Sequence, residues 1–240
     1  MSESARRSLP SPDAISLPLI DSAAGGGSPK PLLRGWLHLG TVPFAIACGV
    51  VLICLAQGAL SKWAATIYML TSLLLFTISA LYHRINWSAR VKAVFRRIDH
   101  ANIFLLIAGT YTPIAIGTLP LQKAWTLLAV VWSGALLGLF FRVFWLSAPR
   151  WLYVPLYLAL GWAAIFYIVD IARGNLAVMI LVLVGGGLYS LGAVAYGTKW
   201  PLRSNRYFGF HEVFHSCTVA AFFCHWVASL LALLDPVYLR

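Results

Sequence analysis

The chain has 240 residues, of which 60% are hydrophobic and 10% are charged, and its mean hydropathy is +0.81. A water-soluble domain cannot bury that much apolar surface, so the composition excludes a soluble globular protein and predicts an all-α polytopic membrane protein. The formal net charge of +11 does not indicate nucleic-acid binding, because the basic residues fall between apolar segments and form no single stripe.

Residues 1–30 are rich in Ser, Pro, Gly and Ala and contain no apolar run long enough for a signal peptide or a spanning helix. We expect them to form a disordered cytoplasmic tail, followed by a membrane domain over residues 31–240. A helix needs about 20 residues to cross the hydrocarbon core. Seven segments meet this requirement, at approximately 36–57, 63–83, 100–118, 123–144, 151–170, 175–196 and 208–234.

The basic residues between these segments predict how the bundle is oriented. Fourteen Lys and Arg residues, Arg142 and Arg150 among them, lie on the same side as the N-terminus, and four lie on the opposite side. Positive charge collects on the cytoplasmic side, so the N-terminus is predicted to be cytoplasmic and the C-terminus outside. In the second connection, Trp87, Val91, Val94, Phe95 and Ile98 share one helix face, which predicts an amphipathic helix lying in the cytoplasmic interface.

Five polar residues from three of the predicted helices converge at the cytoplasmic side of the membrane. Ser79 and His83 end the second helix, Asp99 begins the third, and His211 and His215 begin the seventh. Ionisable residues in such places are costly and usually functional.

The spacing of these residues favours a metal site. His211 and His215 are one helical turn apart, which suits two corners of a tetrahedral metal, and His83 supplies a third nitrogen. Three histidines with an open fourth position are typical of a catalytic zinc site. Asp99 is the expected general base for a bound water, and Ser79 is expected to orient the His83 imidazole or to contact the water.

Other polar residues near this site receive different interpretations. The segment HEVFH also matches the zinc-peptidase motif, in which Glu212 would be the base, but Glu212 points about 100° away from His211 around the helix. We therefore expect an interfacial or supporting role for Glu212. His225 shares the face of His211 but lies about 15 Å deeper than His215, so it is expected to be a hydrogen-bonded polar group or part of a water-filled cavity. His38 and His100 are expected to be hydrated near the interface.

Three blocks of sequence resemble those of a known family. They are SALYH (79–83), RIDHANIFLLIAGTYTP (97–113) and HEVFHSCTVAAFFCH (211–225), and they are similar to the signature blocks of the hemolysin III branch of the progestin and adipoQ receptor family, whose superfamily includes alkaline ceramidases. The resemblance implies a seven-helix bundle with zinc held by His83, His211 and His215. It also implies that Asp99 holds a zinc-bound water with Ser79 nearby, and that the substrate is a lipid amide such as ceramide.

Three functions follow as hypotheses. The first is a zinc-dependent hydrolase of a lipid amide or ester, acting in lipid homeostasis in a bacterial plasma membrane, with a membrane lipid as substrate. The second is a noncatalytic membrane sensor or homeostasis protein that zinc stabilises. The third is a pore-forming cytolysin or ion-conducting protein, which would need a continuous polar stripe along the helices.

Overall fold

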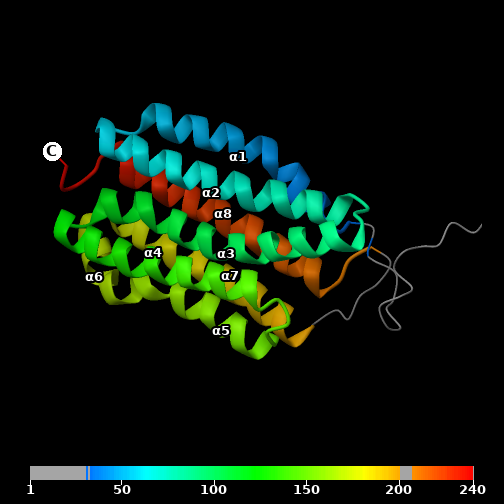
Figure 1. Cartoon of the computed structure of the whole chain (residues 1–240). Helices are drawn as coiled ribbons and strands as arrows, with labels where there is room; N and C mark the ends of the chain where they lie inside the picture. The colour runs from blue at the N-terminus through cyan, green and yellow to red at the C-terminus, as the bar shows by residue number, and fades with distance from the viewer. Residues whose placement is uncertain (1–30, 32, 201–206, 240) are drawn as a thin grey trace, which may run out of the picture. The chain divides into compact units, whose positions relative to one another are not determined.

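The computed structural model describes residues 31, 33–200 and 207–239, so the predicted disordered tail lies outside the described residues. Eight α-helices and one short 3-10 helix make up this part of the chain, which contains no strand (Figure 1). They are α1 (Trp36–Leu55), α2 (Gly58–Arg84), α3 (Ala89–Thr118), α4 (Leu121–Phe144), α5 (Arg150–Gly161), η1 (Ala163–Tyr167), α6 (Ile168–Gly174), α7 (Leu176–Thr198) and α8 (Phe210–Leu234).

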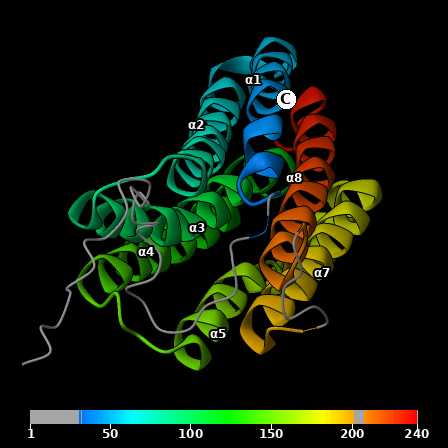
Figure 2. The same cartoon turned by 90° about the vertical axis from the view of Figure 1, so that its right-hand side faces the viewer.

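The helices form a bundle with α3 near its centre. Seven stretches are long and apolar enough to cross a membrane, with α5, η1 and α6 together forming the fifth, so the prediction of an all-α bundle of seven spanning helices is confirmed. In α3, 83% of the apolar window is buried, against 17–50% in the other six. Viewed along the bundle, α1, α2 and α8 lie on one side of α3 (Figure 2). The other side of α3 is occupied by α4, α5 and α7 (Figure 2).

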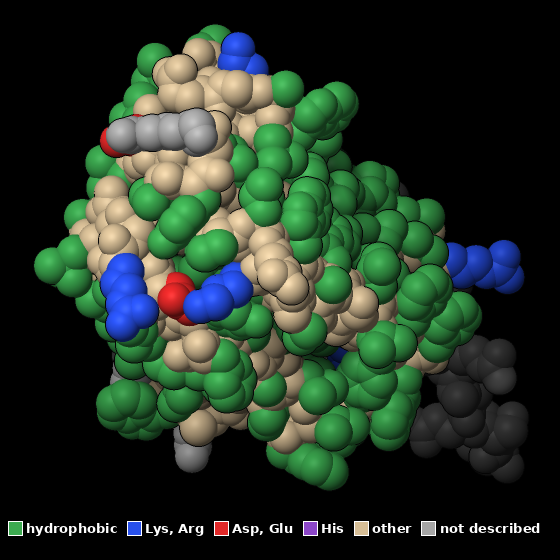
Figure 3. Space-filling model, turned by 90° about the vertical axis from the view of Figure 1, so that its left-hand side faces the viewer, with side chains coloured by type: hydrophobic (Ala, Val, Ile, Leu, Met, Phe, Trp, Pro, Cys, Tyr) green, Lys and Arg blue, Asp and Glu red, His purple; other side chains and the backbone are tan. Residues whose placement is uncertain are grey.

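The outer surface of the bundle suits a lipid environment. Large apolar side chains on α4 and on the fifth span are exposed, including Leu137, Phe144 and Phe166 at 71%, 81% and 86%. Side chains of this kind are favourable against lipid tails and costly against water. The end of the bundle where α8 finishes is also mostly hydrophobic, with few charged side chains (Figure 3). One of its charged contacts joins Lys123 to Asp170 at 2.7 Å.

The fifth span breaks in the middle of its length, and α3 compensates for the break. Where α5 ends, the carbonyl of Gly161 accepts a hydrogen bond from the Tyr111 hydroxyl (2.6 Å), and the N–H of Ala164 donates to the same hydroxyl (2.9 Å). A backbone group left unpaired inside a bilayer costs several kcal/mol. Tyr111 therefore lets an irregular segment exist at membrane depth, beside the central helix.

The prediction of a separate interfacial helix is wrong. The helix begins at Ala89 and runs without interruption to Thr118, so the amphipathic residues form the first three turns of α3. No Gly or Pro lies between residues 89 and 108 to break the backbone hydrogen bonding. Trp87, which precedes the helix, stacks on Phe95 with ring centroids 4.4 Å apart. Asp99 consequently lies in the third turn of α3 and not at its start.

Candidate metal centre

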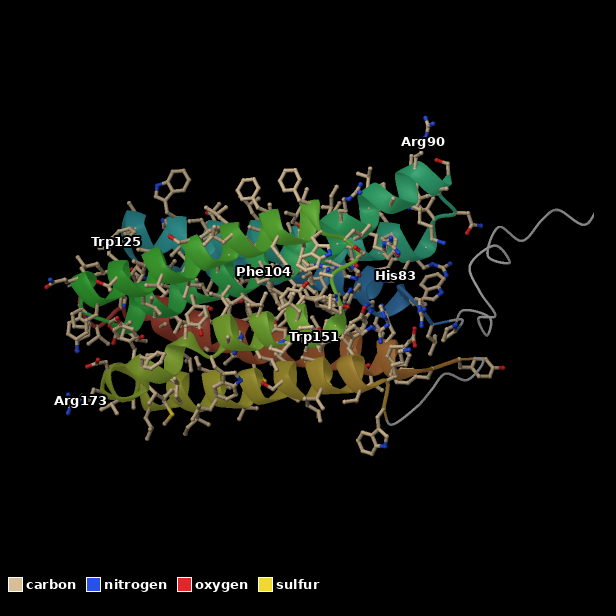
Figure 4. All side chains as sticks on the ribbon, turned by 60° about the horizontal axis from the view of Figure 1, so that its bottom comes forward. His83, Arg90, Phe104, Trp125, Trp151 and Arg173 are labelled. Atoms are coloured by element: carbon tan, nitrogen blue, oxygen red, sulfur yellow. The ribbon has the colours of Figure 1, made fainter. Side chains whose placement is uncertain are left out.

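Three histidines from two helices meet near one end of the bundle. His83 lies in the last turn of α2, and His211 and His215 occupy the first two turns of α8. Figure 4 shows His83 near the end marked by Arg90, with Phe104 at mid-length and Trp125 and Arg173 at the far end. The sequence assigns the Arg90 end to the cytoplasm, so the site lies on the predicted cytoplasmic side.

The ring nitrogens of these histidines can hold one metal ion. One nitrogen from each of His83, His211 and His215 lies within 4.8 Å of the other two. The Nε2 atoms of His211 and His83 are 3.2 Å apart. Two nitrogens bound to a tetrahedral zinc ion at about 2.0–2.1 Å are separated by about 3.3 Å. The donor set and the separation of His83 from His211 therefore fit a tetrahedral ion with three imidazole ligands.

The N-terminal end of α1 approaches the same histidines. Gly35, which precedes α1, has φ of +81°, a conformation that favours glycine. A Cβ atom at this position would lie 2.8 Å from the Cβ of His83. Glycine therefore permits the chain to pass directly against the base of the His83 side chain, and it fixes the start of α1 beside the site.

Glu212 forms an ion pair that faces α1. Its side chain is 1% exposed, and its Oε1 accepts a hydrogen bond from Arg34 Nε at 2.8 Å. Its second oxygen has no hydrogen-bond partner among the described residues. Glu212 is thus a buried partner of Arg34. Of the two roles expected for it, interfacial or supporting, the interfacial one is wrong, because α1 covers this face of α8. The pair holds the start of α1 against the turn that carries His211.

His38 lies at the site, although the three-histidine group does not include it. Its ring stacks face to face on that of His215, with centroids 3.8 Å apart and an angle of 9° between the planes. The side chain is 2% exposed, and neither ring nitrogen has a partner among the described residues. The expectation that His38 would be hydrated at the interface is wrong, because α8 and Phe76 of α2 cover it.

Asp99 and Ser79 lie together beside the histidines. A side-chain hydrogen bond joins the Ser79 hydroxyl to the Asp99 carboxylate. Both residues line the cavity that also exposes His211 and His215. Since a carboxylate accepts hydrogen bonds, the serine hydroxyl is the donor. Ser79 therefore orients Asp99 in this arrangement, whereas the sequence predicted that it would orient His83 or contact the water.

His100 belongs to a separate polar cluster. Its Nδ1 lies 2.9 Å from an Nη atom of Arg142, and its backbone carbonyl accepts a hydrogen bond from the Tyr157 hydroxyl at 3.0 Å. Arg142 is 1% exposed, and its guanidinium carbon lies 4.2 Å from the ring centre of Tyr153. The sequence counted Arg142 among the charges of a cytoplasmic connection, which is wrong, because the residue lies inside the last turn of α4.

A large cavity joins these groups to the middle of the bundle. It runs between α3, α5, α7 and α8 and holds about 1450 Å³ of space, counting the part that opens to the surroundings. Its walls are mainly apolar and aromatic, and its polar residues are His38, Ser79, Asp99, His100, Thr110, Tyr111, Tyr153, Tyr157, Tyr189, Ser190, Tyr196, His211, His215, Thr218 and His225.

Four residues contact this region although their positions in the sequence did not predict it. They are His38, Arg142, Tyr153 and Tyr196. Tyr196 lies beside His211, with ring centroids 5.6 Å apart. The tyrosines carry no spacing signal, because Tyr153 comes from α5 and Tyr196 from α7, and neither helix carries one of the three histidines. The position of Arg142 in the sequence did carry a signal. A guanidinium within three residues of an apolar helix end has to be either at the interface or paired inside, and position alone cannot decide between these.

Comparisons with known proteins agree with this architecture. The family model described as Haemolysin-III related matches residues 27–226. The Hemolysin-3 homolog of Bacillus subtilis (strain 168) is 35% identical over 192 residues, which are 76% of this chain and 86% of that protein. Hemolysin-3 of Bacillus cereus is 38% identical over 135 residues, which are 55% of this chain and 61% of that protein. The chain therefore belongs to the haemolysin-III-related family.

Proposed function

We propose that this protein is a zinc-dependent hydrolase that cleaves an amide or ester bond of a membrane lipid. The observation that carries the proposal is the convergence of three imidazole nitrogens within 4.8 Å of one another. Two of these histidines, His211 and His215, line a mainly apolar cavity together with Asp99 and Ser79. Relatives from two Bacillus species favour the plasma membrane of a bacterium as its location.

The chain supplies the groups that such a hydrolysis needs. A zinc ion on the three histidines would make a bound water more acidic and would polarise the carbonyl of the substrate. Asp99 accepts the proton of the attacking water on its carboxylate oxygen, and the Ser79 hydroxyl holds that carboxylate in place. Asp99 then returns the proton to the leaving amine or alcohol. Asp99, Ser79 and two of the three histidines, His211 and His215, line the same cavity.

The cavity walls favour a lipid substrate. Trp162 and Ile165, at the break in the fifth span, line the cavity and are 36% and 46% exposed. Exposed apolar side chains at the edge of a cavity would let a chain enter sideways from the bilayer. Apolar walls of this kind match an acyl chain and exclude most water-soluble substrates.

The test combines metal analysis with turnover. Purified protein is expected to contain close to one zinc per chain, and a variant with His83, His211 and His215 all changed to Ala is expected to contain none. Turnover of a panel of lipid amides and esters should require the metal. It should disappear in Asp99→Asn while the zinc remains, and persist in Asp170→Asn, which makes the same chemical change at the far end of the bundle. Full turnover in Asp99→Asn would remove Asp99 from the role.

A noncatalytic membrane sensor stabilised by zinc is the second candidate. It is favoured by the contact of His83 with both histidines of α8, since the ring centroids are 4.8 and 5.3 Å apart. A metal there would join α2 to α8 whether or not a reaction occurs. This candidate predicts that metal removal lowers the thermal stability while no lipid of the panel is ever cleaved. Ion flux through liposomes that persists in the triple variant would instead favour a pore.

A further inference from the structure

The deep end of the cavity contains two side chains that each have an unpaired polar atom. His225 of α8 and Tyr189 of α7 both line the cavity, and their ring centroids are 5.5 Å apart. His225 is 7% exposed. Neither His225 Nδ1 nor the Tyr189 hydroxyl has a hydrogen-bond partner among the described residues. Buried polar atoms are nearly always paired, so this pair calls for an explanation.

The surroundings show that the fold makes room for the histidine at this depth. A Cβ atom at Gly185 of α7 would collide with Nε2 of His225, so the glycine allows the ring to lie flat against α7. The other polar groups nearby are already satisfied. Trp162 donates its indole N–H to Ser190 Oγ at 2.9 Å, and Ser190 donates to the Gly186 carbonyl at 2.8 Å. The unpaired groups are therefore specific to His225 and Tyr189.

The hydrogen bonding of His225 defines what it can bind. Its Nε2 lies 3.4 Å from the Val182 carbonyl oxygen. A carbonyl only accepts, so Nε2 carries the proton of the ring. No ion pair of the described residues includes His225, and an uncharged imidazole is the form that suits this depth. Its Nδ1 is then an acceptor that needs a donor from the cavity.

A single small group can satisfy both residues. It must donate a hydrogen bond to His225 Nδ1 and accept one from the Tyr189 hydroxyl. A carbonyl or an ether cannot donate to Nδ1, and a methylene can do neither. An aliphatic hydroxyl does both. Because His225 is ten residues after His215 on the same helix, this hydroxyl would lie about 15 Å along the bundle from the metal centre.

We propose that His225 and Tyr189 form a binding subsite for a hydroxyl group on the aliphatic chain of the bound lipid. The group lies near the middle of a long chain whose carbonyl end reaches the three histidines. The subsite rests on the proposed function for the orientation of the chain, because the carbonyl must lie at His83, His211 and His215. The substrate class is therefore lipids with a hydroxylated chain. The apolar wall between the histidines and the subsite matches the methylenes that separate the carbonyl of such a lipid from its hydroxyl.

The test measures binding and needs no turnover. Purified protein in nanodiscs is loaded with a fluorescent fatty acid, which is then displaced by stearate or by stearates hydroxylated at successive positions. Wild-type protein is expected to bind a mid-chain isomer about tenfold more tightly than stearate, which is the effect of one or two neutral hydrogen bonds. Tyr189→Phe removes a single oxygen and is expected to abolish the preference while leaving the affinity for stearate unchanged. Tyr167→Phe, outside the cavity, should keep the preference.

Other outcomes would overturn the subsite. Equal affinity for all isomers would mean that the pair holds only water, and a preference that survives in both Tyr189→Phe and His225→Phe would place the hydroxyl elsewhere. Wild-type protein that binds none of the fatty acids would also refute it. A mid-chain preference without turnover of any lipid would support the subsite and refute the hydrolase alone.

Discussion

The buried ion pair between Arg34 and Glu212 gives the sharpest prediction about the HExxH segment. Glu212 is 1% exposed and Arg34 is 21% exposed. Removing the more exposed partner should therefore be the more damaging change. Arg34→Ala leaves a buried carboxylate with no partner on either oxygen, since Oε2 already has none among the described residues.

The magnitudes follow from this difference in burial. An uncompensated charge left by breaking a buried pair costs about 3–5 kcal/mol, and because water reaches Arg34, we expect about 3 kcal/mol for Arg34→Ala. Glu212→Gln keeps an oxygen that can accept from Arg34 Nε, and it leaves a guanidinium that water can solvate. We expect a loss of about 1 kcal/mol. In the double variant, Arg34→Ala should cost less than it does alone, because no charge remains to be buried.

The assay is unfolding of the purified protein in detergent, followed by the fluorescence of its ten tryptophans, together with zinc content and lipid turnover. Asp170→Asn is the matched control, because Asp170 pairs with Lys123 at 2.7 Å with side chains 23% and 48% exposed. Exposed pairs contribute at most about 1 kcal/mol. Glu212→Gln should retain its zinc and its turnover. Loss of turnover with the zinc still bound would make Glu212 the base, as in the peptidases, and equal destabilisation by the two single variants would refute the burial argument.

Three further predictions concern the metal and the packing around it. Removing the metal with a chelator should lower the melting temperature of the wild-type protein and leave that of His83→Ala unchanged, as differential scanning fluorimetry would show. Gly35→Ala should cost about 1–3 kcal/mol in unfolding experiments and weaken zinc binding in a metal titration, because φ is +81° and the new Cβ would meet His83. Gly40→Ala, where a Cβ meets nothing within 4 Å, should be tolerated. Arg142→Ala should cost about 2–5 kcal/mol, measured by the same unfolding assay, and more than Arg142→Met, since Arg142 is the largest of the fully buried side chains.

The spans could be predicted because the bilayer fixes their length. Each predicted segment overlaps one observed span, and apart from the break in the fifth span the errors lie at the ends. The second helix begins at Gly58, although the sequence placed its start after Lys62, because the exposed Lys62 side chain can sit within a helical turn at the end of the bundle. The third helix is longer by eleven residues at its start. Hydropathy marks where a helix leaves lipid, and it does not mark where the helix ends.

The clustering of the three histidines was predictable for a related reason. Helical spacing puts His211 and His215 on one face, and the alternation of the spans brings the end of α2 to the depth of the start of α8. The contacts between helices had no comparable signal. Nothing in the order of residues indicates that the His38 ring would stack on His215, or that Arg142 would turn inward to His100, since both depend on which helices become neighbours.

The segment HEVFH shows how a motif acquires its meaning from the neighbouring helix. The 100° turn between successive residues directs Glu212 away from the face that carries His211 and His215. In a soluble enzyme that direction can still lead to the substrate. Here it leads to the turn that precedes α1, where Arg34 Nε donates to the carboxylate at 2.8 Å, while Asp99, held by Ser79, lines the cavity with His211 and His215. The spacing of the motif therefore places His211 and His215 on one helix face, and the ion pair with Arg34 gives Glu212 a role in holding the start of α1 against α8.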